Sequence, residues 1–142
     1  MKVLIFGNSG SGKTTLAEPL AEKLKGVWIN ADAVRAKAED WDFSIQGRVR
    51  QMQRMNMIAE GVQMADKIAV CDFICPMRES RKEFAADFVV WMNTIENGRY
   101  DDTNMIFQEP EEDDVDYIVT EWSDDTVEIL TKLIKKKKTK NS

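Results

Sequence analysis

The residues with the clearest chemical potential lie near the N-terminus, in the stretch GNSGSGKTT at positions 7–15. The spacing Gly7-x-x-x-x-Gly12-Lys13-Thr14 is the pattern of a phosphate-binding loop, or P-loop. Glycines at such positions let backbone N–H groups turn inward and form a concave nest for anionic oxygens. An apolar run precedes the loop and a helical pattern follows it, as this motif requires. The spacing therefore predicts a site for the phosphates of a nucleoside triphosphate.

The predicted nucleotide site draws on one continuous segment of the chain. The helix that begins near Gly12 points its positive end at the phosphates. Lys13 is expected to reach the β- and γ-phosphates of ATP and to act in catalysis, and the Thr14 hydroxyl to bind Mg²⁺. The alternative, a glycine turn with an incidental lysine, is disfavoured by the flanking strand and helix. The predicted ATP-binding residues are Gly7, Ser9, Gly10, Ser11, Gly12, Lys13, Thr14 and Thr15.

Asp72 is a second candidate metal ligand, because it follows the apolar run IAVC at the end of a predicted strand. An acidic residue at that place can hold Mg²⁺ beside the phosphates. The alternative is that Asp72 only caps the strand end. The chain has no histidine, so a general base must be Asp, Glu, Lys or a water molecule.

Side chains for a second substrate follow the second predicted strand and lie on the long helix after it. Asp32 and Arg35 follow the strand, and Arg48 and Arg54 lie on the helix with a glutamine midway between them. Arginines beside a P-loop indicate an acceptor that is itself anionic. The alternative is a solvated helix face paired with Asp or Glu, which we favour for Arg50 but not for Arg48.

The elements that must position these residues are alternating strands and helices. Such alternation implies a parallel sheet with right-handed crossovers. The predicted fold class is therefore α/β, a P-loop kinase fold with a five-stranded parallel sheet flanked by helices, in a single domain over residues 1–142. The expected strands cover 2–6, 27–30, 67–73, 87–92 and 116–120, and the expected helices cover 12–25, 46–66, 77–86 and a last helix that begins at Asp124 and Asp125 after a Ser123 cap.

Composition narrows the function classes. The net charge of −5 argues against a general nucleic-acid binder, and no apolar run approaches the length of a membrane span. Cys71 and Cys75 are interpreted as reduced thiols of a cytoplasmic protein. Residues 93–114 are expected to form an irregular acidic loop, and residues 135–142 a frayed, solvated basic tail. The expected partner is therefore a small molecule rather than a nucleic acid or a membrane.

Several motifs together resemble the adenylylsulfate kinase (APS kinase) family, which phosphorylates the 3′-hydroxyl of adenosine 5′-phosphosulfate in sulfate assimilation. The family's loop GLSGSGKST is similar to GNSGSGKTT here, and its LDGDNVR is similar to INADAVR. Its FSxxDRxxNIRR is similar to FSIQGRVRQMQR, and its ISPYRxxR to ICPMRESR. The resemblance covers most of residues 2–81, and the last two motifs discriminate best because many families share the P-loop.

The resemblance implies a role for each matched position. Asp32 would be the catalytic base or would orient the acceptor hydroxyl. Arg35, Arg48 and the backbone near Cys75 would hold the phosphosulfate, and Phe43 would stack on the acceptor's adenine. The implied substrate-binding residues are Asp32, Arg35, Phe43, Arg48, Gln51, Ile74, Cys75 and Pro76, and the implied metal ligands are Thr14 and Asp72.

The chain also departs from the family pattern. Asn30 and Ala31 replace the first acid and the glycine of DGD, and Gly47 replaces the acid before the arginine of the third motif. The lid motif RDxKGLYxxAR has no counterpart. A shortened enzyme could be slow, borrow cations from a second subunit in a homodimer, or have changed its acceptor. Three functions stay open: an APS kinase-like enzyme, a kinase for a nucleoside monophosphate or another small phosphorylated metabolite, and a non-catalytic nucleotide-binding module.

Overall fold

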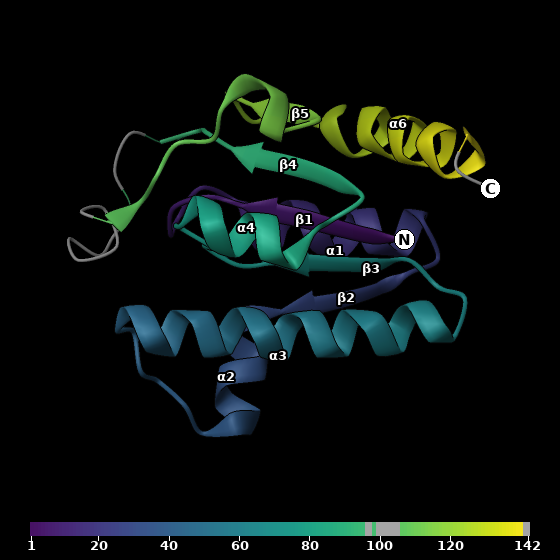
Figure 1. The fold of residues 1–142 in the computed structure, drawn as a ribbon. Helices are drawn as coiled ribbons and strands as arrows, with labels where there is room; N and C mark the ends of the chain where they lie inside the picture. Colours follow the sequence, from purple (N-terminus) through teal and green to yellow (C-terminus); the bar gives the residue numbers. More distant parts are fainter. Residues whose placement is uncertain (96–97, 99–105, 141–142) are drawn as a thin grey trace.

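One five-stranded sheet organises the chain, whose computed structural model describes residues 1–95, 98 and 106–140 (Figure 1). The strands are all parallel and lie in the order β2-β3-β1-β4-β5. The predicted α/β class and all five predicted strands are confirmed. The strands are β1 (Lys2–Phe6), β2 (Val27–Asn30), β3 (Ala69–Asp72), β4 (Phe88–Met92) and β5 (Tyr117–Val119).

Helices cover both faces of the sheet. They are α1 (Lys13–Lys23), α2 (Ala31–Ala38), α3 (Ile45–Met64), α4 (Arg78–Phe84) and α6 (Thr126–Lys140). Val3 and Ile5 of β1 point into the core that contains α1 and α6, whereas Leu4 and Phe6 point into the core that contains α3 and α4. Burial on both faces explains why the strands are continuous apolar runs in the sequence.

Two helix predictions are wrong. The sequence analysis did not predict α2, which follows β2 with no intervening loop because Asn30 both ends the strand and caps the helix. The Asn30 Oδ1 accepts a hydrogen bond from the Ala33 N–H at 3.0 Å, and such caps stabilise helix starts. The last helix begins at Thr126 rather than at Asp124, because Asp124 and Asp125 form a turn in front of it.

The two segments predicted to be irregular have different outcomes. Helix α6 continues through Lys140, so the prediction of a frayed tail is wrong for Lys135–Lys138, although most of these side chains are exposed. Within the predicted loop 93–114, residues 112–114 form a 3₁₀ turn, while 96–97 and 99–105 lie outside the described residues. No helix in the described part of the chain is long and apolar enough to cross a membrane.

The parallel sheet brings three functional segments to one edge. The register pairs Ile5 with Asp72 and Asn30 with Asp72. The end of β1, which leads into the glycine loop, therefore lies beside the ends of β2 and β3. Ligands of open α/β sheets bind at this carboxyl edge of the strands.

Candidate active site

A cavity of about 690 Å³ opens at the carboxyl edge of the sheet. Two groups of segments line it, and we call them its two walls: the glycine loop with the start of α1, and α2 with the segment around Phe43, the start of α3 and the segment after β3. Gly7 and Ser11 are buried and do not line the cavity. The predicted site residues that line it are Ser9, Gly10, Gly12, Lys13, Thr14, Thr15, Asp32, Arg35, Phe43, Arg48, Gln51, Asp72, Ile74, Cys75 and Pro76.

The glycine loop has the backbone conformation that its sequence predicts. Gly7, Gly10 and Gly12 have φ values of 154°, 87° and 98°, a region that side chains disfavour. A Cβ atom at Gly7 would lie 2.6 Å from the carbonyl oxygen of Met92, at the end of β4. The loop is therefore packed against the sheet edge so closely that only glycine fits at its first position.

The start of α1 faces the cavity without a capping side chain. Its N-cap is Gly12, where no side-chain cap hydrogen bond forms, and a helix N-terminus of this kind suits an anion. The Lys13 Nζ donates to the Asn8 carbonyl at 3.0 Å, which holds the ammonium over the loop. The Thr94 hydroxyl donates to the Ser11 carbonyl at 2.7 Å and supports the loop from outside.

Asp72 lies at the centre of a small polar cluster under the loop. It is 3% exposed, and its Oδ1 lies 3.4 Å from the Thr14 hydroxyl. Its Oδ2 accepts hydrogen bonds from the Trp28 indole N–H at 2.5 Å and from the Asn30 amide at 3.3 Å. Burial raises the pKa of Asp72, and the hydrogen bonds from Trp28 and Asn30, with the charge of Lys13, partly offset that rise. This environment suits a carboxylate that binds a metal cation.

In the second wall, two buried arginines lie beside an aromatic ring. Arg35 and Arg48 are 4% and 7% exposed, and their guanidinium carbons lie 4.4 Å and 5.4 Å from the centroid of the Phe43 ring. Arg35 donates to the carbonyls of Asp40 and Asp42, at 3.0 Å and 3.1 Å. Burial lowers the pKa of Arg35. An anion bound here would contact guanidinium groups that are already largely desolvated.

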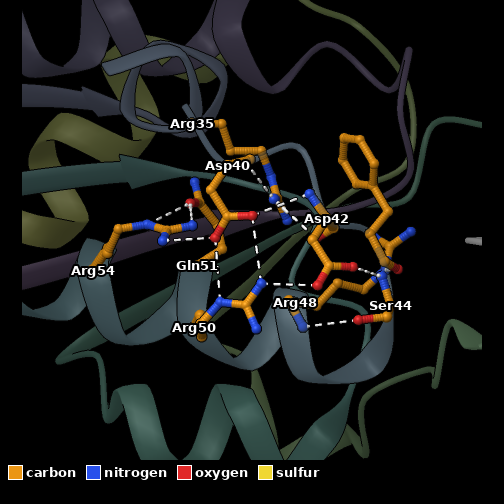
Figure 2. Close-up of polar contacts among 10 residues, drawn as sticks. Arg35, Asp40, Asp42, Ser44, Arg48, Arg50, Gln51 and Arg54 are labelled. Carbon is orange, nitrogen blue, oxygen red and sulfur yellow. Dashed lines mark hydrogen bonds and ion pairs between the residues drawn. The ribbon is translucent and has the colours of Figure 1, made fainter. Parts of the chain in front are cut away.

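Arg50 and Arg54 have a different role from Arg48 (Figure 2). The Asp40 Oδ2 bridges them, at 3.2 Å from Arg50 Nε and 2.8 Å from Arg54 Nη1, and Arg50 also binds Asp42 at 2.8 Å. Hydrogen bonds from Arg50 lower the pKa of Asp42 to about 2. The interpretation of Arg50 as a paired, solvated residue is confirmed. Arg54 does not line the cavity, so its assignment to the site is wrong: its guanidinium binds Asp40 and Gln51 instead.

Asp32 and Gln51 are linked through the first turn of α2. Asp32 lies in that turn, is exposed, and lines the cavity. The Gln51 Nε2 donates to the carbonyl of Ala31 at 2.9 Å, which ties α3 to the start of α2. Gln51 is 3% exposed, so it fixes the backbone that carries Asp32.

The segment after β3 is held in a strained conformation. Cys75 has a φ of 41°, which is uncommon for a residue with a side chain. Arg81 stabilises the segment by donating to the Cys75 carbonyl at 2.8 Å, and the Pro76 carbonyl accepts from the Gln108 N–H at 2.7 Å. Burial raises the pKa of the Cys75 and Cys71 thiols to about 12, so neither thiol is reactive.

Sequence reasoning missed two tryptophans of the site. Trp28 lies two residues before Asn30 on β2, so both side chains share one face of the strand and can reach Asp72. Trp41 lines the cavity although its side chain is 53% exposed. The signal for Trp41 was an aromatic residue two positions before Phe43. The sequence analysis argued from spacing along the long helix, which does not include Trp41.

Comparisons with known proteins identify the family and agree with the fold. The family model described as adenylylsulphate kinase matches residues 1–96. The APS kinase of Mycobacterium tuberculosis, solved with AMPPNP and APS, superposes with a TM-score of 0.78 at 20% identity, over 94% of this chain and 96% of that one. Shikimate kinase from Aquifex aeolicus superposes with a TM-score of 0.63 at 16% identity, over 96% and 98% of the two chains. No curated protein matches significantly in sequence.

Proposed function

The chain belongs to the adenylylsulphate kinase family, and on that premise we propose that it transfers the γ-phosphoryl group of ATP to the 3′-hydroxyl of adenosine 5′-phosphosulfate. Family and fold together identify a P-loop kinase. One observation carries the finer proposal: a single cavity has the glycine loop on one wall and two buried arginines around Phe43 on the other. Such a cavity offers places for two anionic substrates.

The glycine loop fits the triphosphate of ATP. Three glycines in left-handed conformations and the uncapped start of α1 present N–H groups where anionic oxygens would lie. Lys13, which already lies over the loop, would hold the outer phosphates. A Cβ at Gly7 would lie 2.6 Å from the Met92 carbonyl oxygen, so glycine is required for the loop to pack this closely on the end of β4.

The cluster around Asp72 fits Mg²⁺. Asp72 supplies a carboxylate and Thr14 a hydroxyl, both hard oxygen donors of the kind that Mg²⁺ prefers. In the described residues no group of three or more His, Cys, Asp or Glu side chains could hold a metal ion, so substrate phosphates would complete the coordination. When bound, Mg²⁺ would neutralise charge that develops on the phosphoryl oxygens. Trp28 and Asn30 hold the Asp72 carboxylate in place for that contact.

On the acceptor side, the chain positions a hydroxyl rather than creating a strong nucleophile. Arg35 and Arg48 bind the anionic group of the acceptor, and Phe43 stacks on its base. Asp32 then accepts the proton of the attacking hydroxyl or orients that hydroxyl toward the γ-phosphorus. Because phosphoryl transfer depends mainly on positioning and on charge stabilisation, these residues supply most of what the reaction requires.

A kinase with another anionic acceptor is the second candidate. Asn30 and Ala31 stand where the family pattern has an acid and a glycine, and both lie on the cavity wall beside Asp32. Asn30 has a structural task of its own, because it binds Asp72 and caps α2. A nucleoside monophosphate or another small phosphorylated metabolite would satisfy Arg35 and Arg48 equally well.

Coupled ADP release measured over a panel of acceptors tests the proposal. We expect adenosine 5′-phosphosulfate to release ADP well above the rate in buffer and faster than AMP, other nucleoside monophosphates or sugar phosphates. If another acceptor is preferred, the second candidate replaces the first. If no acceptor raises ADP release while Mg-ATP still stabilises the protein against heat, the chain is a nucleotide-binding module without turnover.

Two further predictions belong to the proposal. Cys71 and Cys75 are both free and buried, as expected in a reducing, cytoplasmic compartment.

A homodimer could supply cations over the phosphates, since the family's basic lid motif has no counterpart in the sequence. Light scattering of the purified protein with and without nucleotide checks that assembly. Among solved structures, the hexameric APS kinase from Thiobacillus denitrificans superposes with a TM-score of 0.67 at 22% identity, over 96% of this chain and 28% of that one.

A further inference from the structure

Trp41 is a large apolar side chain that lines the cavity without being buried. Its side chain is 53% exposed, and it forms part of the cavity wall. Its ring centroid lies 6.5 Å from that of Phe43, with the two planes tilted by 42°. Single exposed apolar residues are common on protein surfaces and need no explanation by themselves. Two features of the surrounding structure distinguish this one.

The first feature is that the backbone on both sides of Trp41 is fixed. The carbonyls of Asp40 and Asp42 both accept hydrogen bonds from Arg35. The Asp40 carboxylate binds Arg54 and Arg50, and the Asp42 carboxylate binds Arg50. Residues 40–42, between α2 and α3, are called the turn below. Figure 2 shows these contacts reaching the turn from α2 and from α3. Trp41 is therefore presented to the cavity from a turn that is anchored at both of its neighbours.

Gly47 allows the same turn to pack closely on α3. A Cβ atom at Gly47 would lie 2.1 Å from the Asp42 carbonyl oxygen, so the turn packs directly on the backbone of α3. The Ser44 hydroxyl accepts from the Gly47 N–H at 3.1 Å and caps the helix at this point. The turn has little freedom to withdraw Trp41 from the cavity.

The second feature is the charge that lies behind the neighbouring aromatic ring. The guanidinium groups of Arg35 and Arg48 lie over the Phe43 ring, while 43% of the Phe43 side chain remains exposed. Trp41 and Phe43 thus form a splayed aromatic wall beside two buried positive charges. A ligand with a flat ring and an anionic group matches both parts of this wall, whereas a sugar phosphate matches the charges but has no aromatic ring to stack.

We propose that Trp41 is a specificity-determining residue for the acceptor, and that with Phe43 it stacks on the base of a nucleotide. The inference rests on the proposed function, because it assigns the acceptor to this wall of the cavity. It goes further in naming a residue outside the matched motifs. It also predicts that acceptors without a base bind poorly even when they carry the same anionic group.

Steady-state kinetics of Trp41→Ala and Trp41→Phe test this assignment. Base stacking on an aromatic side chain changes affinity by roughly 5- to 100-fold on removal, so Trp41→Ala should raise the KM for adenosine 5′-phosphosulfate about tenfold. The kcat and the KM for ATP should stay within about twofold, because the proposed contact is with the acceptor and not with ATP. Trp41→Phe should recover most of the loss. Met64→Ala is the matched control, since Met64 is 89% exposed and lines no part of the cavity.

A binding measurement separates this inference from the proposed function. With the donor site filled by the β,γ-imido analogue of ATP, AMP should quench the tryptophan fluorescence of the wild type but not of Trp41→Phe. An unchanged acceptor KM in Trp41→Ala overturns the inference, and so does equal quenching in both proteins. If the wild type turns over no acceptor, the proposed function fails, and the quenching experiment alone then decides the role of Trp41.

Discussion

The two walls of the cavity are built in different ways. The wall proposed to bind ATP, here called the donor wall, consists mainly of backbone: three glycines in left-handed conformations and the start of α1. The wall proposed to bind the acceptor, here called the acceptor wall, consists of side chains that other side chains hold, as when Arg50 binds the carboxylates that flank Trp41. A backbone site depends on the spacing of a few neighbouring residues. A side-chain site depends on contacts between segments distant in sequence, so we expect single substitutions to damage the two walls to different extents.

Lys13→Ala should have the largest effect, because it removes the positively charged side chain of the donor wall. We expect ADP release to fall about 1,000-fold, in the range seen when a charge-stabilising group is lost, with the melting temperature unchanged. Lys23→Ala, at an exposed position of the same helix, is the control. Retention of more than a tenth of the wild-type rate by Lys13→Ala would remove Lys13 from the mechanism.

Asp32→Asn should come next and should act on the other wall. Loss of a group that accepts or orients the hydroxyl proton lowers kcat by about 100-fold or more, while ATP affinity measured by calorimetry should change little. Asp124→Asn, in the exposed turn before α6, controls for the loss of one negative charge. A normal kcat in Asp32→Asn would show that this carboxylate does not act on the acceptor.

Trp28→Phe tests a contact that holds Asp72, the proposed metal ligand. The substitution keeps an aromatic ring but removes the N–H that Asp72 accepts. Loss of such a supporting hydrogen bond typically weakens metal binding about tenfold, so a higher Mg²⁺ concentration should be needed for half-maximal thermal stabilisation by ADP. Trp91→Phe is the control, because Trp91 stacks on Phe6 in the core and does not line the cavity. Identical Mg²⁺ titrations would mean that Trp28 only fills space.

Arg50→Ala should have the smallest effect, because Arg50 reaches the acceptor only through the turn that it anchors. We expect the KM for the acceptor to rise about threefold, since exposed ion pairs contribute little. The effect on stability should depend on pH. The folded-state pKa of Asp42 is lowered from 3.8 to about 2, so the pairing stabilises the turn above about pH 4 and is lost as the pH falls toward 2.

Thermal melts at several pH values check the predicted pH dependence of the Arg50–Asp42 pairing. The difference in melting temperature between wild type and Arg50→Ala should be complete at pH 6 and should shrink below pH 4. Lys37→Ala removes a positive charge from the exposed surface of α2 without touching Asp42, and should show no such convergence. A constant difference across the whole range would contradict the assignment of the pairing to Asp42.

The sequence predicted local features well and contacts between distant segments poorly. The glycine spacing and the apolar strands depend on neighbouring residues, so the sheet and the donor wall could be predicted. Helix α2 was missed because Asn30 serves both β2 and α2, which leaves no loop residues to mark the boundary. Arg48 and Arg54 have the same helical spacing relative to Gln51, and contacts with Asp40 and Gln51 hold Arg54 away from the cavity. That choice depends on a turn whose path no local pattern specifies.

The two buried thiols make the molecule convenient for site-directed labelling. Cys71 and Cys75 lie in the core with pKa values raised to about 12, so almost no thiolate forms at neutral pH and maleimide reagents should leave both untouched. A cysteine introduced at an exposed surface position would then be the preferred attachment point for a fluorophore, with no need to delete the native pair. A fluorophore attached in that way beside the cavity would report changes in its surroundings when Mg-ATP is added.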